Sequence, residues 1–236
     1  MRLFCRLKFS LVIASVLALA LLDTTSAQVK VPENYGQALS WYQRAAKAGD
    51  VKAQYLLARM LEDGLKGDPD IAAAVSWYEK AAAQGHLESQ LKLAHLFFSD
   101  EKFRRSLPRA AKWFGAAAKS GSAQAAYNLG LMHENDWGVD KDPSKAAALY
   151  STAANGGITS AQINLAMLYV MGKGVAKDNV KALTWLTVAK LSGAPTPNAI
   201  RQAVAKGLTG EQRQQVERDA RAIKVEIERK LVRPRE

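Results

Sequence analysis

The chain has a single cysteine, Cys5, and three histidines, His86, His95 and His133, among its 236 residues. With no second cysteine, a disulfide within the chain is excluded and stability must come from packing. The histidines fall at unrelated positions. We find no His-Glu-x-x-His motif, no Cys-His pair and no phosphate-binding glycine loop. These absences favour a protein that is not an enzyme and holds no metal or cofactor.

Acidic residues are scarce beside basic ones: 22 Asp and Glu stand against 33 Lys and Arg, which gives a net charge of +11. A basic balance suits an anionic lipid, an acidic polysaccharide, an acidic protein partner or simple solubility. The densest basic patch precedes and enters an expected helix start at Ser106 and Pro108, where a solvated turn is the plainer interpretation. Its members are Lys102, Arg104, Arg105, Arg109 and Lys112.

The N-terminus has the pattern of a secretory signal peptide over residues 1–27. Arg2, Arg6 and Lys8 precede an apolar run at 9–22, which small residues follow up to Ala27. Cleavage there removes three positive charges and one negative charge, so the net charge falls from +11 to +9. We expect a periplasmic or secreted protein with no membrane span after cleavage, and a retained anchor is the alternative. Export argues against a nucleic-acid partner.

A period of 36 residues runs through the rest of the chain. It is plainest in five glycines and five alanines: Gly49, Gly85, Gly121, Gly157 and Gly193, and Ala38, Ala74, Ala110, Ala146 and Ala182. Apolar steps of three and four within each copy predict a pair of helices, one carrying aromatic residues and the other Leu and Ala. Good N-cap residues recur at the same period before the aromatic helix, at Asn34, Asp70, Ser106, Asp142 and Asp178.

The repeat resembles the Sel-one-like repeat, a relative of the tetratricopeptide repeat. The fullest copy runs from Ala146 to Asp178 and contains Ala161-Gln162 and Gly172-Lys173-Gly174-Val175. The resemblance covers about residues 33–193 and implies an all-α, right-handed superhelical solenoid of helix pairs, within a domain at 28–193. Two places depart from the pattern: the stretch 100–107 lacks the glycine turn, and His133 with Asp136 replace an aromatic residue and a glycine.

The resemblance also implies a concave groove lined by the first helix of each pair. Residues at the outward positions of these helices differ between copies, whereas the Ala, Leu and Gly positions barely change. Variable positions can specify a partner, so we expect a binding site in the groove. Its candidate residues are Lys52, Tyr55, Arg59, Leu91, His95, Phe98, Tyr127, Leu131, Ile163 and Met167.

Residues 194–236 fall outside the period and are expected to form capping helices. Thr209 and Gln212 have capping-box spacing, and Val216, Ala220, Ile223, Ile227 and Leu231 mark an apolar stripe. Terminal repeats need a polar-backed cover, which makes this helix a cap. The alternatives are a partner-binding helix and a helix that folds back into the apolar end of the groove.

Two functions therefore lead. The first is an exported scaffold or adaptor that binds a protein partner in its groove and regulates an envelope process such as signalling, exopolysaccharide production or secretion, as the resemblance implies. The second is a non-catalytic binder of an acidic envelope polymer, either polysaccharide or cell wall. An RNA-binding repeat fits the charge but conflicts with the leader. Cysteine-rich relatives linked to beta-lactams use a disulfide in each repeat, which this chain lacks.

Overall fold

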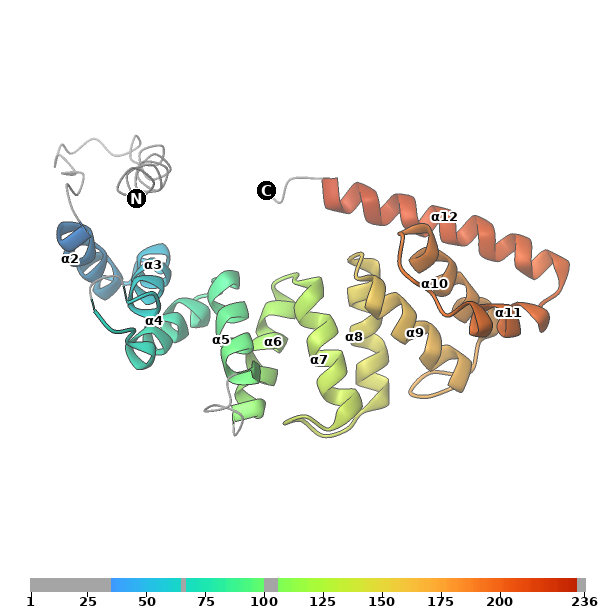
Figure 1. Ribbon diagram of the computed structural model, residues 1–236, viewed down its shortest axis with the longest axis horizontal. Coiled ribbons are helices and arrows are strands. Elements are labelled where there is room, and N and C mark those ends of the chain that lie inside the picture. Colours follow the sequence, from blue (N-terminus) through green and yellow to red (C-terminus); the bar gives the residue numbers. More distant parts are fainter. Residues whose placement is uncertain (1–34, 65–66, 100–105, 233–236) are drawn as a thin grey trace. The chain divides into compact units, whose positions relative to one another are not determined.

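The computed structural model describes residues 35–64, 67–99 and 106–232, and within these ranges every regular element is a helix (Figure 1). The predicted signal peptide at 1–27 lies outside the described residues. The helices are α2 (Tyr35–Lys47), α3 (Val51–Glu62), α4 (Ile71–Ala83), α5 (Leu87–Ser99), α6 (Leu107–Lys119), α7 (Ala123–Asn135), α8 (Pro143–Asn155), α9 (Thr159–Met171), α10 (Asn179–Leu191), α11 (Asn198–Lys206) and α12 (Gly210–Val232).

Three of the five predicted N-cap side chains make a capping hydrogen bond. The carboxylates of Asp70, Asp142 and Asp178 each accept a backbone N–H from the first turn of α4, α8 and α10. Ser106 stands at the N-cap of α6 as predicted, but its side chain makes no capping hydrogen bond. Asn34 lies outside the described residues.

Helix ends follow the glycine period. The five glycines at 36-residue spacing all have positive φ, between 82° at Gly193 and 98° at Gly49. Only glycine adopts this conformation at little cost, so the residue allows the chain to leave one helix and enter the next within a few residues. The sequence period is therefore a period of backbone geometry.

From Leu39 onward the chain forms one compact unit in which successive helices pack in order. We call α3, α5, α7 and α9 the A helices, and α4, α6, α8 and α10 the B helices. Each A helix packs against the B helix that follows it, and each of α4, α6 and α8 packs against the next A helix. The predicted all-α solenoid of helix pairs is confirmed.

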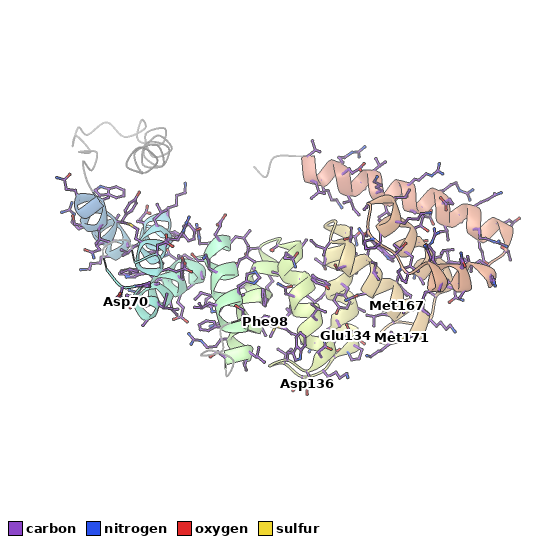
Figure 2. All side chains as sticks on the ribbon, viewed as in Figure 1. Asp70, Phe98, Glu134, Asp136, Met167 and Met171 are labelled. Carbon is purple, nitrogen blue, oxygen red and sulfur yellow. The ribbon has the colours of Figure 1, made fainter. Side chains whose placement is uncertain are left out.

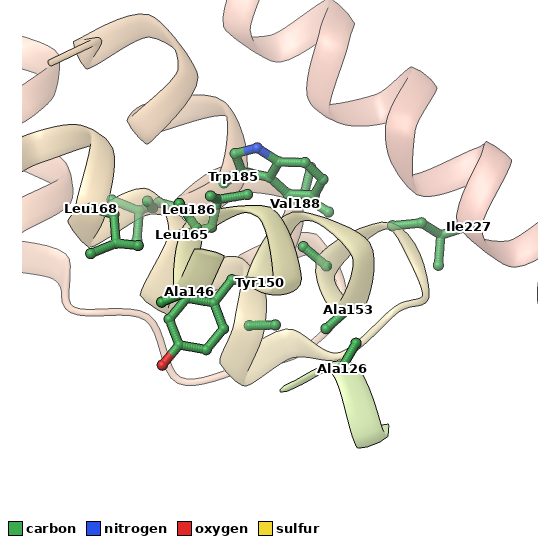
Figure 3. Packing of buried hydrophobic residues seen from close by; sticks show 14 of the residues in the cluster. Ala126, Ala146, Tyr150, Ala153, Leu165, Leu168, Trp185, Leu186, Val188 and Ile227 are labelled. Carbon is green, nitrogen blue, oxygen red and sulfur yellow. The ribbon is translucent and has the colours of Figure 1, made fainter. Parts of the chain in front are cut away.

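Two large apolar clusters hold the pairs together. One joins α3 to α7 around Phe97, Trp113 and Phe114, and the other joins α7 to α10 and α12 around Tyr150 and Leu165 (Figure 3). Smaller clusters lie between α2 and α3 and around α11. Small residues at the helix contacts let the backbones approach closely: Gly130 has no room for a Cβ atom, which would lie 2.7 Å from the Tyr150 ring.

A repeated glutamine links three of the four units to the unit before them. The Gln54, Gln90 and Gln162 side-chain amides each donate to a carbonyl oxygen eight residues earlier, at 3.1, 3.1 and 3.2 Å. These glutamines are buried, and each carbonyl, which also accepts the N–H of the glycine three residues later, lies at the end of the preceding aromatic helix. Ala126 stands at the third of these four positions, so that unit lacks the bond.

Helices α11 and α12 form within the predicted C-terminal segment 194–236. Thr209 and Gln212 exchange the two hydrogen bonds of a capping box, at 2.9 and 3.2 Å, as predicted. Helix α12 packs along α10 (Figure 1), with Val216, Ala220 and Ile227 buried. Leu231 is 66% exposed, so the predicted apolar stripe ends before it.

No described helix is long and apolar enough to cross a membrane.

Candidate functional site

The predicted partner-binding residues all lie on A helices, but only some are exposed. Lys52, Arg59 and His95 are exposed, whereas the other seven are half-buried. Tyr55, Leu91 and Phe98 pack against the first large cluster, and Tyr127 and Leu131 pack against the second. Ile163 and Met167 are half-buried outside both large clusters. We call the surface formed by these ten residues the A-helix face.

Tyr55 and Tyr127 are more than variable surface residues. The Tyr55 ring lies 5.9 Å from the Tyr78 ring, and the Tyr127 ring lies 5.8 Å from the Tyr150 ring. Tyr78 and Tyr150 are buried on the B helices. The interpretation of Tyr127 as a purely outward-facing position therefore needs correction, because its loss would also remove an aromatic contact inside the unit.

Two glutamates at the ends of A helices hold these buried tyrosines. The Tyr78 hydroxyl donates to Glu62 Oε2 at 2.6 Å, and the Tyr150 hydroxyl donates to Glu134 Oε2 at 2.5 Å. Burial and the neighbouring carboxylate raise the pKa of both tyrosines well above its ordinary value, so both keep their protons. Burial acts to raise the pKa of Glu62, but hydrogen bonds from Tyr78 and Lys92 outweigh it and the pKa is lowered.

These pairs reveal a second period of 72 residues that the sequence reading missed. In the intervening units the same two positions are apolar: Phe98 faces Phe114 at 6.1 Å between ring centroids, and Val170 and Leu186 replace them in the last unit. Acidic-aromatic and apolar units thus alternate. The signal was present in Glu62, Tyr78 and their counterparts at 134 and 150.

An open pocket of about 200 Å³ lies beside the first pair, between α3, α4 and α5. Glu62, Tyr78 and Lys92 supply its polar lining together with His95, and Ile71, Val75 and Leu96 supply its apolar lining. Burial lowers the pKa of His95, with Lys92 acting in the same direction, so its imidazole is neutral at pH 7. The Lys92 ammonium lies 3.0 Å from Glu62 Oε1 and occupies that carboxylate.

The predicted basic patch is only partly described, since Lys102, Arg104 and Arg105 lie outside the described residues. Arg109 forms an ion pair with Glu79 and lies 3.9 Å from the centre of the Phe97 ring. Lys112 is exposed and lies 5.0 Å from the Trp113 ring. Arg109 is thus held by contacts within its own chain. Of the two described members of the basic patch, only Lys112 makes no ion pair.

In the third unit, the predicted departure at His133 and Asp136 has a local structural role. Asp136 has φ 61°, the left-handed conformation that Gly172 adopts at the equivalent position with φ 67°. His133 Nδ1 lies 3.1 Å from the carbonyl oxygen of Asp140 and ties the loop back to α7. In the described part of the chain, no three His, Cys, Asp or Glu side chains cluster in a way that could hold a metal ion.

Comparison with known proteins identifies the repeat. The model of the Sel1 repeat matches five consecutive stretches, 27–50, 51–86, 87–122, 123–158 and 159–193. The three full-length matches and the last one each contain one A helix and the B helix that follows it. Curated proteins compared with the chain give no match.

A solved structure shows the same architecture. A Sel1 repeat protein from Oxalobacter formigenes is 30% identical, with a TM-score of 0.60 over 79% of this chain and 78% of that one. A protective antigen of uropathogenic Escherichia coli with an SLR fold is 27% identical, with a TM-score of 0.46 over 87% of this chain. The match spans 53% of that antigen, about half its length. Sel1 repeats generally form non-catalytic scaffolds that mediate protein–protein interactions. The chain belongs to the Sel1 repeat family.

Proposed function

We propose that this protein is an exported, non-catalytic adaptor that binds a segment of a protein partner on its A-helix face and thereby regulates an envelope process. One observation carries the proposal. At the A-helix face the side chains change from unit to unit, while the repeated Ala, Leu and Gln positions behind them are buried. Positions that packing constrains less than the repeated core are where specificity can reside.

The chemistry of the face suits a polypeptide. It combines charged side chains at Lys52 and Arg59 with half-buried apolar ones at Leu131, Ile163 and Met167. Protein interfaces are built in this way, from apolar and aromatic anchors within a polar rim. Export rests on the signal-peptide pattern of residues 1–27 and sets the location as periplasmic or secreted.

A second candidate is attachment to an acidic envelope polymer, either polysaccharide or cell wall. The net charge of +9 after residue 27 favours it, as do exposed cations on the B helices such as Lys80, Lys112 and Lys119. Attraction of this kind weakens steeply with salt, whereas apolar contact does not. The two candidate functions therefore predict different binding surfaces: the A-helix face for a protein partner, and the B-helix cations for an acidic polymer.

Site-specific photo-crosslinking in the native envelope tests the proposal. A crosslinker is placed at His95 or Met167 on the A helices, with Lys112 on α6 as the matched exposed control. We expect one discrete protein to be captured from both A-helix positions and not from Lys112. Equal capture from Lys112, or capture of polymer alone, would contradict the adaptor function and support the second candidate.

A further inference from the structure

The two Glu–Tyr pairs are copies of one arrangement, and the first copy is complete. Glu62 has both carboxylate oxygens engaged: Oε2 accepts from the Tyr78 hydroxyl at 2.6 Å, and Oε1 lies 3.0 Å from Lys92 Nζ. Lys92 comes from α5, the A helix of the next unit. The complete copy thus has a carboxylate, a tyrosine and a cation.

The second copy lacks the cation. Glu134 Oε2 accepts from the Tyr150 hydroxyl at 2.5 Å, but the position equivalent to Lys92 is Asn164, an uncharged side chain beside Tyr150. Among the described residues, no Lys or Arg forms an ion pair with Glu134. Glu134 Oε1 therefore presents the charge that a lysine neutralises in the first copy.

The repeat relates two methionines of the second copy to polar residues of the first. His95 and Ser99 line the pocket beside Glu62, and their equivalents 72 residues later are Met167 and Met171. Met171 is 55% exposed, and both methionines are labelled with Glu134 in Figure 2. Methionine side chains adapt to varied apolar groups and are frequent at surfaces that bind protein segments.

We propose that Glu134, Met167 and Met171 bind a lysine or arginine side chain of the protein partner. The inference rests on the adaptor function proposed above and names the chemistry that its partner must present. The glutamate takes the ammonium or guanidinium group in the place that Lys92 holds beside Glu62, and the methionines contact the aliphatic part of the side chain. An acidic polymer offers no such cation, and Glu134 would repel it.

The repeat itself supplies the variants. Asn164→Lys should fill the site from within, because Lys92 stands at the equivalent position of a unit that folds. Lys92→Asn should create the same vacancy beside Glu62. Glu134→Gln removes the charge and keeps the size and an acceptor for Tyr150. Circular dichroism and the thermal midpoint show that each variant folds.

The probe is a labelled Gly-Ser-Leu-Lys-Leu-Ser-Gly peptide, with a second peptide in which norleucine replaces the lysine. Binding is followed by fluorescence anisotropy and by the methyl NMR signals of the methionines. We expect the lysine peptide to bind about fivefold more tightly, as for a partly exposed ion pair. Its binding should shift the Met167 and Met171 signals, whereas those of Met60 and Met132 should stay in place.

In Asn164→Lys and in Glu134→Gln, the preference for lysine should be lost. Adding Lys92→Asn to Asn164→Lys should restore it beside Glu62, without shifts at Met167 or Met171. Equal affinity for the two peptides in the wild type, or a preference that survives Asn164→Lys, overturns the inference. If crosslinking from His95 still captures one protein in those cases, the adaptor function stands and only this site is wrong.

Discussion

Side chains at equivalent positions of the repeat do the same structural task with different chemistry. At the start of the A helices, the Asp50 carboxylate and the Ser122 hydroxyl accept a backbone N–H, at 2.6 and 3.2 Å. His86 holds the same place in front of α5, where its Nδ1 atom accepts the Ser89 N–H at 3.3 Å. An imidazole can accept at Nδ1 only while that nitrogen carries no proton.

We predict that this histidine makes stability depend on pH. Burial lowers the pKa of His86 from 6.5, with Glu88 opposing the shift and Lys52 adding to it. The unfolded chain therefore takes up the proton first, and stability falls as the pH drops below about 6.5. In His86→Asp, which copies Asp50, the thermal midpoint should fall less between pH 7.5 and pH 5.5, by a few degrees.

The same scan on His95→Leu, which copies Leu131, separates the effect of His86 from that of the exposed His95, because partial burial of the ring also lowers the pKa of His95. If His86→Asp follows the wild-type curve throughout, His86 does not cap α5 in the way described.

At the scale of single residues, the sequence predicted the roles of residues that recur in the repeat well. It predicted the roles of residues specific to one unit poorly. The glycines and the capping aspartates follow from backbone geometry and local hydrogen bonding, which act within a few residues. The link between Glu134 and Tyr150 joins two helices across 16 residues, and its charge balance depends on Asn164 in a third. Such contacts require the packed structure.

Helix α12 shows how one element completes the array. It packs on α10, the last B helix, on which Trp185 and Leu186 are already buried. Its far end reaches the turn between α8 and α9, where a Cβ atom on Gly157 would lie 3.1 Å from Ile227 and 3.3 Å from Leu231. These contacts support the cap as the role of α12, which we propose in place of a free partner-binding helix.

A matched pair of glycine variants tests this placement. Gly157→Ala and Gly121→Ala should both be destabilising by about 1 kcal/mol, because the two residues share positive φ, 87° and 90°. Only Gly157 has α12 within reach, whereas nothing lies within 4 Å of a Cβ on Gly121. Chemical denaturation should therefore show the larger loss for Gly157→Ala. Equal losses would place α12 elsewhere.

Element positions were predictable because periodicity and turn chemistry are local. The helix pairs, their order and a helix after Thr209 all followed from spacing. The sequence did not reveal which surface α12 covers, because its stripe of Val216, Ala220 and Ile227 would suit any apolar face of the last units. The predicted stripe also included Leu231, which is exposed in the structure.

On the scale of the whole molecule, stability should pass from unit to unit. Trp113 is 7% exposed and belongs to the cluster that joins α3 to α7, so Trp113→Ala should cost about 3 kcal/mol by leaving a cavity. Hydrogen exchange should then accelerate in α5 and α7 as well as in α6. A loss confined to α6, or a thermal midpoint that does not change, would show that the units are independent.

The central claim is that the A-helix face, and not the basic surface, holds the partner. We would measure the affinity of the crosslinked partner for Met167→Lys and Lys112→Glu, each at low and high salt. The account predicts a loss of about tenfold or more for Met167→Lys, which opposes the partner's cation, little change for Lys112→Glu, and weak dependence on salt. The opposite pattern, with Met167→Lys neutral, Lys112→Glu weakened and binding abolished by salt, would contradict it.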